Sequence, residues 1–163
     1  MSDTPFYEML VYLDGSEGSM CALMYAIAMA KSTGAKLHAA YVVNSKALGD
    51  LVKSRIFIDQ ERNEYLADLK ADAERHLRHA RKLADQKGVE IDTLELEGSP
   101  HSVVMDYVKQ NHIDMLVIGP VNVIRSRREE LTSENDRMLR TCPCPVLVVK
   151  DSDDIWRMFE EDF

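Results

Sequence analysis

The feature that most constrains the fold is an apolar run that ends in a glycine and is followed by a polar loop, a helix and a second apolar run. Met115–Ile118 is apolar throughout and leads into Gly119, which is typical of a buried strand ending at a sharp bend. Ser133 and Asp136 have the spacing of a helix N-cap and its N3 residue. Residues 146–149 form the second apolar run, so the segment predicts a βαβ unit with parallel strands.

The same alternation of strand and helix patterns extends over the rest of the chain. The other predicted strands are Glu8–Leu13, Lys36–Val43 and residues 89–96, and the other predicted helices are residues 20–32, 59–87 and a helix that begins at Pro100 with Ser99 as its N-cap. Residues 44–58 are ambiguous, with a short helix indicated. Five alternations predict one α/β domain: a five-stranded parallel sheet with right-handed crossovers and helices on both faces.

Composition and charge narrow the class of protein. A chain of 163 residues, 45% of them hydrophobic, is large enough for one domain with its own core. No apolar run approaches the roughly 20 residues of a membrane-spanning helix, and the first residues lack the pattern of a signal peptide. We therefore expect a cytoplasmic protein without a membrane partner. The formal net charge of −8 argues against a nucleic-acid partner.

The cysteines and histidines do not predict a metal site. Cys21, Cys142 and Cys144 are an odd number of cysteines in a chain without a signal peptide, which favours reduced thiols. No second cysteine or histidine pair stands at a suitable spacing from Cys142 and Cys144. The favoured interpretation of these two is small apolar residues at a helix-to-strand junction.

The C-terminal tail, residues 151–163, differs in composition from the domain that we assign to residues 1–150. Residues 150–163 hold two basic and six acidic residues, a net charge of −4 and thus half of the total. The tail also carries Trp156, Phe159 and Phe163 at a roughly helical spacing. Because burying an aromatic side chain yields about 1.5–3 kcal/mol, we predict that the tail folds back onto the domain. The alternative is that these aromatic residues bind an unknown protein partner.

Four segments of the chain closely resemble the universal stress proteins. They are residues 10–19, 98–100, 113–119 and 138–149, which occur in the order and at the spacings of that family. The resemblance covers about residues 8–150. It implies a Rossmann-like sheet of order 3-2-1-4-5, of the adenine nucleotide alpha hydrolase-like type, a homodimer, and a cytoplasmic role in stress tolerance. Members of the family divide into those that bind ATP and those that do not.

The ATP loop of the family, Gly-x2-Gly-x9-Gly-Ser/Thr, is only partly present. Gly119 occupies its first position and Ser133 its last, whereas Asn122 and Thr132 replace the two middle glycines. Glycine lets the backbone approach phosphate oxygens and adopt positive φ. Asparagine tolerates left-handed geometry, but the β-branched threonine does not. Pro120 removes a further backbone donor.

Other positions of the resemblance leave two interpretations open. Asp14 and Gly15 follow the first strand, where family members place an aspartate beside the adenosine half of the nucleotide; an Asx turn that needs no ligand is the alternative. Val42 and Val43 match positions lining the adenine pocket, and they serve equally well as core. Arg125 and two further loop arginines either clamp phosphates or belong to a solvated loop face.

Three functions from different classes follow. The first is a non-catalytic, dimeric stress-response protein with no obligatory cofactor. The second is a nucleotide sensor that binds ATP or another adenine nucleotide, and the third is an enzyme acting on a nucleotide. Glu134 and Asp136 lie at the positive end of the predicted helix dipole, where a triphosphate would compete with them. Together with the substituted glycines they favour the first function. No Walker loop, Rossmann glycine triplet or nucleophile elbow is present, so we do not expect an enzyme.

The last predicted strand indicates how a dimer would form. Val146, Leu147, Val148 and Val149 are apolar on both faces, yet the implied strand order places them at an edge of the sheet. An exposed apolar edge strand is an aggregation hazard unless it is covered. Antiparallel pairing of two copies would cover both edges with two-fold symmetry. The alternative cover is the tail of the same chain.

Overall fold

The structure, a computed structural model, describes residues 7–54, 58–121 and 133–161. Its core is one sheet in the order β3-β2-β1-β4-β5, and every neighbouring pair of strands is parallel. The strands are β1 (Glu8–Leu13), β2 (Lys36–Val43), β3 (Ile91–Glu97), β4 (Met115–Ile118) and β5 (Val146–Val148). The predicted five-stranded parallel sheet of order 3-2-1-4-5 is confirmed.

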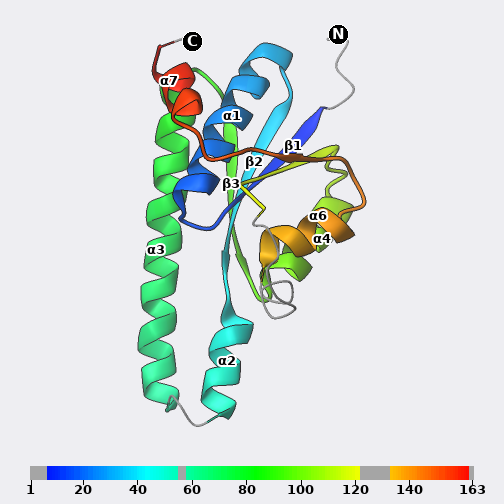
Figure 1. Cartoon of the computed structure of the whole chain (residues 1–163). Coiled ribbons are helices and arrows are strands. Elements are labelled where there is room, and N and C mark those ends of the chain that lie inside the picture. The colour runs from blue at the N-terminus through cyan, green and yellow to red at the C-terminus, as the bar shows by residue number, and fades with distance from the viewer. Residues whose placement is uncertain (1–6, 55–57, 122–132, 162–163) are drawn as a thin grey trace.

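Helices cover both faces of this sheet, as predicted (Figure 1). One face is covered by α1, α3 and α7, and the other by α4 and α6. The helices are α1 (Glu17–Thr33), α2 (Ser45–Lys53), α3 (Asp59–Gln86), α4 (Pro100–Gln110), α6 (Glu134–Thr141) and α7 (Asp153–Glu161). None of these described helices combines the length and the apolar character that crossing a membrane requires.

The two layers have separate hydrophobic cores because strand side chains alternate between the faces. Val11 of β1 packs with the small apolar residues of α1. Leu10 and Tyr12 point to the opposite face and pack in one cluster with residues of α4 and β4. The inner strands β1 and β4 are almost completely buried, and the edge strand β3 alternates between exposed and half-buried residues. The strand order that the resemblance implies, with β3 at an edge of the sheet, is therefore confirmed.

Local signals explain where α1 begins and ends. The Ser16 hydroxyl accepts a hydrogen bond from the Ser19 backbone N–H at 3.2 Å, and Gly34 ends the helix with a φ of 77°. The predicted start of the third strand at residue 89 was wrong. Because the Val89 N–H still donates to the Ala84 carbonyl at the end of α3, at 2.9 Å, β3 begins at Ile91.

The helix α3 is longer than the strands that it covers. Its 28 residues correspond to a length of about 42 Å at 1.5 Å per residue. Its first half and α2 therefore extend beyond the carboxyl ends of the strands (Figure 1). The segment that was ambiguous from sequence thus provides α2, which packs against this part of α3.

The C-terminal tail folds back onto the domain through α7, as predicted. Phe159 is 4% exposed and packs with Ile155 and Met158 into the core beneath α1. Trp156, by contrast, is 37% exposed, and Phe163 lies outside the described residues. The main helix partner of α7 is α1, so α7 lies on a face of the molecule and not along the outer edge of β5 (Figure 1).

Candidate functional site

The carboxyl ends of β1, β2 and β4 and the start of α6 meet at one edge of the sheet. β1 is the central strand, with β2 on one side and β4 on the other, so the residues that follow these strands are neighbours. The candidate residues that the structure places at this edge are Asp14, Gly15, Val42, Val43, Gly119 and Ser133. Asn122, Arg125 and Thr132 lie outside the described residues.

Asp14 forms an Asx turn at the start of α1. Its Oδ1 atom accepts hydrogen bonds from the backbone N–H of Ser16, at 2.9 Å, and from the Ser16 hydroxyl. The same hydroxyl oxygen caps α1 through Ser19. The carboxylate of Asp14 is therefore already engaged within its own turn, which is the geometry of the alternative that needs no ligand.

Gly15 lies directly against an imidazole ring from α3. Its φ is +84°, and a Cβ atom at this position would lie 3.1 Å from Nε2 of His76. The His76 ring also stacks on Tyr41 of β2, with ring centroids 5.1 Å apart and an angle of 11° between the planes. Burial, with added effects from Asp72 and Asp14, raises the pKa of Tyr41. Sequence reasoning missed His76, because nothing in its helical pattern shows which strand end it faces.

Gly119 is explained by packing rather than by a ligand. A Cβ atom there would lie 2.9 Å from the carbonyl carbon of Gly18, in the first turn of α1. Gly18 is constrained in turn, since its own Cβ would lie 2.5 Å from Cδ of Pro120. The amide Nδ2 of Asn135 donates to the Pro120 carbonyl at 3.1 Å and joins α6 to the end of β4. The match of Gly119 to the ATP loop is therefore weak support for phosphate binding.

The start of α6 carries the predicted cap. The Ser133 hydroxyl accepts a hydrogen bond from the Asp136 backbone N–H at 3.3 Å. The buried carboxylate of Asp136 pairs with Arg140, one helical turn further on. Both groups thus stabilise α6 itself.

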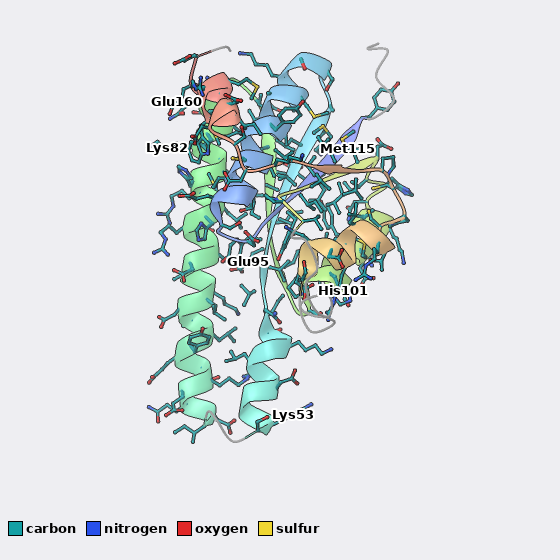
Figure 2. The ribbon with its side chains drawn as sticks, in the orientation of Figure 1. Lys53, Lys82, Glu95, His101, Met115 and Glu160 are labelled. Atoms are coloured by element: carbon teal, nitrogen blue, oxygen red, sulfur yellow. The ribbon has the colours of Figure 1, made fainter. Side chains whose placement is uncertain are left out.

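Glu134 joins α6 to α4. Its Oε2 atom accepts the backbone N–H of His101, which is labelled in Figure 2, at 2.9 Å and lies 3.3 Å from Nδ1 of the same residue. Ser99 stands at the N-cap position of α4 as predicted, but its side chain makes no cap hydrogen bond. The acceptor at the start of α4 is therefore a carboxylate from another helix, 33 residues away in sequence.

The pKa of Tyr12 is affected by burial and by two carboxylates at this edge of the sheet. Burial raises its pKa far above the ordinary value of 10.0, and the neighbouring carboxylates of Asp14 and Glu134 raise it further. Tyr12 is only 5% exposed, so its hydroxyl is shielded from solvent as well as exposed to the charge of both carboxylates. An anionic ligand would enter the field of the same two carboxylates.

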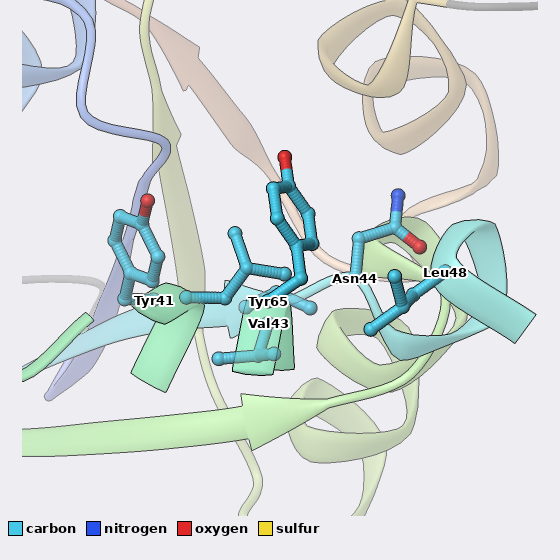
Figure 3. Close-up of a pocket in the computed structure, with 7 residues that line it drawn as sticks. Tyr41, Val43, Asn44, Leu48 and Tyr65 are labelled. Carbon is cyan, nitrogen blue, oxygen red and sulfur yellow. The ribbon is translucent and has the colours of Figure 1, made fainter. Parts of the chain in front are cut away.

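A cavity of about 290 Å³ opens where β2 ends beneath α2 and α3 (Figure 3). This volume is at the lower end of the range of about 300–1,000 Å³ for small-molecule sites. Val43 is almost fully buried, so its side chain also belongs to the core. The lining residues are Tyr41, Val42, Val43, Asn44, Leu48, Tyr65 and Leu69. Sequence reasoning identified only the two valines. It missed Tyr41 and Asn44 beside them, and Leu48, Tyr65 and Leu69, which come from α2 and α3.

Within the described parts of the chain, no group of three or more histidine, cysteine, aspartate or glutamate side chains is arranged to hold a metal ion. The three cysteines are free thiols. Cys21 is buried under α7, where its Sγ lies 3.4 Å from the Asp151 carboxylate. The other two lie between α6 and β5.

The sequence and the fold both assign the chain to a family. The model of the universal stress protein family matches residues 6–150, so the chain belongs to this family and the resemblance is confirmed. The universal stress protein YxiE of Bacillus subtilis is 30% identical over 151 residues, which cover 89% of this chain and 99% of that protein.

Solved structures of the same family share the fold. The universal stress protein UspA from Lactobacillus plantarum superposes with a TM-score of 0.72 at 24% identity, covering 90% of this chain and 99% of that one. An Arabidopsis thaliana family member with AMP bound superposes with a TM-score of 0.63 at 17% identity, covering 91% and 94% of the two chains.

Proposed function

We propose that this universal stress protein is a non-catalytic, dimeric stress-response protein of the cytoplasm that requires no bound nucleotide. The observation that carries the proposal is the carboxylate of Glu134 at the start of α6, held there by its hydrogen bond to His101. A helix N-terminus attracts phosphate because it is positive, and a fixed carboxylate at that place cancels the attraction. The Asx turn at Asp14 and the packing of Gly119 support the same proposal.

The serines of the site support a non-catalytic role. Ser16 and Ser133 are helix caps whose hydroxyl oxygens accept backbone N–H groups. A nucleophile needs a general base that is held by a third group and points at its hydroxyl. Asp14 is instead bonded to both the hydroxyl and the backbone of Ser16, which is a turn geometry.

Calorimetric titration with Mg-ATP tests the nucleotide part of the proposal. We expect binding weaker than a dissociation constant of about 10 μM, which corresponds to about −6.8 kcal/mol. Tighter binding would contradict the proposal. The variant Glu134→Gln keeps an acceptor for His101 but removes the charge, so it should bind ATP more tightly than the parent protein. Glu160→Gln on α7 changes the net charge equally, far from His101 and the start of α4 (Figure 2), and should leave ATP binding unchanged.

A second candidate function is binding of a nucleotide with a single phosphate. It is favoured by the 290 Å³ cavity beside Val42 and Val43, where the resemblance implies an adenine pocket. The AMP-bound Arabidopsis relative supports this candidate. One phosphate brings less charge towards Glu134 than three do, so AMP should bind more tightly than ATP. Titration with both nucleotides, and mass spectrometry of any nucleotide released from the denatured protein, test this order; preferential ATP binding would contradict it.

The proposed dimer uses the outer side of β5. On its inner side β5 pairs with β4, with Val146 opposite Leu116 and Val148 opposite Ile118. In the part of the chain that the structure describes, no strand pairs with its outer side, and α7 packs against α1 instead. An apolar strand with one side unpaired among the described residues supports pairing with a second copy.

Sedimentation equilibrium tests the dimer. We expect a mass of about 37 kDa, twice the 18.6 kDa of the chain. The variant Val148→Lys should dissociate or precipitate the protein, because it places an ammonium group in an apolar seam. A monomer that persists to about 100 μM, which corresponds to an association weaker than about −5.5 kcal/mol, would contradict the proposal.

A further inference from the structure

Two thiols converge at the junction between α6 and β5. Cys142 is the C-cap residue of α6, where its backbone N–H donates to the Met138 carbonyl at 2.9 Å. Cys144 stands two residues later, before Pro145 and β5. Their Sγ atoms are 3.4 Å apart. Both residues are half-buried and pack against the same hydrophobic cluster, so the two side chains share one side of the junction.

The separation of the sulfur atoms limits which ligand they can share. With bonds of about 2.3 Å to a central atom, a separation of 3.4 Å corresponds to an angle of about 95° at that atom. A tetrahedral centre with the same bonds would need the sulfur atoms about 3.8 Å apart, and a linear centre about 4.6 Å. Of these three arrangements, the observed separation is closest to that of a pyramidal, three-coordinate centre.

The surroundings of the thiols limit the ligand further. No third cysteine, histidine or carboxylate among the described residues joins the pair in a metal-binding group. Within the described residues the pair supplies two ligands, so it suits a central atom that brings its own third ligand. Thiolates select soft, thiophilic centres. Trivalent arsenic with one organic substituent meets all these requirements.

We propose that Cys142 and Cys144 form a dithiol site that chelates a trivalent organoarsenical. Two arsenic–sulfur bonds form and the arsenic–oxygen bond of the arsenoxide breaks. The oxide oxygen leaves as water with the two thiol protons, so that no electron is transferred and no oxidant is needed. The ring that forms links the end of α6 to the start of β5.

Redox exchange is the less suitable chemistry for this pair. A disulfide requires a separation of about 2.05 Å, so the sulfur atoms would have to move well over 1 Å closer. Burial and the neighbouring Cys142 thiol raise the pKa of Cys144 to about 12, whereas thiols that exchange readily at neutral pH have lowered pKa values. Chelation of one atom between the thiols fits the observed distance better.

Intact-mass spectrometry of the full-length protein with phenylarsine oxide tests the proposal. We expect one adduct per chain that survives an excess of the monothiol 2-mercaptoethanol and is released by 2,3-dimercaptopropanol. Cys142→Ser and Cys144→Ser should each weaken binding by about 10²–10⁴-fold, because attachment through two points gains that factor in effective concentration. Cys21→Ser is the matched control and should keep the adduct, since Cys21 lies under α7.

One further measurement keeps the test decisive if a serine variant folds poorly. Alkylating the thiols of the parent protein with N-ethylmaleimide should abolish the adduct. The proposal is overturned if no adduct forms, if the monothiol removes it, or if either serine variant of the pair keeps it at full affinity.

Discussion

The two ends of the sheet use their polar side chains in different ways. At the amino end, polar groups join segments that are distant in sequence: Asp114 accepts the backbone N–H groups of Tyr7 and Glu8 at 2.8 and 2.9 Å. The imidazole of His38 lies 2.6 Å from the Glu8 carboxylate and 3.0 Å from the Tyr107 hydroxyl. At the carboxyl end, Asp14 and Ser133 bond to residues only two and three positions away.

This difference indicates that the amino end of the sheet stabilises the fold, whereas the carboxyl end has room for a ligand. Contacts between distant segments oppose the separation of strands and helices, so the amino end holds β1, β2, β4 and α4 together. Contacts within one turn stabilise only that turn and leave room between the strand ends. The cavity beside Val43 lies at the carboxyl end, as expected for parallel sheets. Glu134 and Asn135 differ from this pattern, since they bond to His101 of α4 and to the Pro120 carbonyl after β4.

Removing the carboxylate at the amino end should have the largest effect. Asp114→Ala leaves two backbone N–H groups without their charged acceptor, and each such bond is worth about 1.5–3 kcal/mol. We expect a loss of about 3 kcal/mol in the free energy of unfolding, measured by urea denaturation. Asp14→Ala, the matched control at the carboxyl end, should lose about 0.5–1.5 kcal/mol. Equal losses at the two ends would contradict the comparison.

Backbone packing at the carboxyl end should give the next largest effect. Gly119→Ala places a Cβ 2.9 Å from the backbone of Gly18, and overpacking of this kind costs about 1–3 kcal/mol. Gly49→Ala in α2 meets no atom within 4 Å and should instead stabilise the protein by about 0.5–1 kcal/mol. Thermal and urea denaturation of the two variants measure both changes. An unchanged stability of Gly119→Ala would show that this packing is loose enough to admit a side chain.

The smallest effect concerns Tyr12 and appears only at alkaline pH. Its pKa is raised in the folded state above the ordinary 10.0, so its contribution is intact below pH 10. Above pH 10 the unfolded chain loses the proton first, and stability falls by up to about 1.4 kcal/mol per pH unit. Tyr12→Phe removes this contribution and should show a shallower decline of unfolding free energy above pH 10. Identical alkaline slopes for the two proteins would mean that the Tyr12 hydroxyl is well solvated.

Much of the fold was predictable because its signals are local. The bounds of β1, β2 and β4 match the apolar runs, and Ser16 and Gly34 mark the ends of α1. The start of β3 was wrong by two residues, since a helix-terminal hydrogen bond at Val89 carries no sequence signal of its own.

The candidate site was less predictable. Sequence reasoning identified Asp14, Val42 and Val43, but only through the family resemblance. It missed the imidazole beside Gly15 and the carboxylate that caps α4, because both come from helices distant in sequence. The roles of Asn122, Arg125 and Thr132 stay predictions.

The sequence alone determined the class of fold, the order of elements and the N-caps of α1 and α6. Each of these depends on periodicity or on hydrogen bonds between residues a few positions apart. Only the tertiary structure decided that Glu134 serves α4, that Gly119 is needed by α1, and that the thiols of Cys142 and Cys144 converge to 3.4 Å. The physical reason is that such contacts depend on side-chain direction and on how elements pack, and neither is set by spacing along the chain.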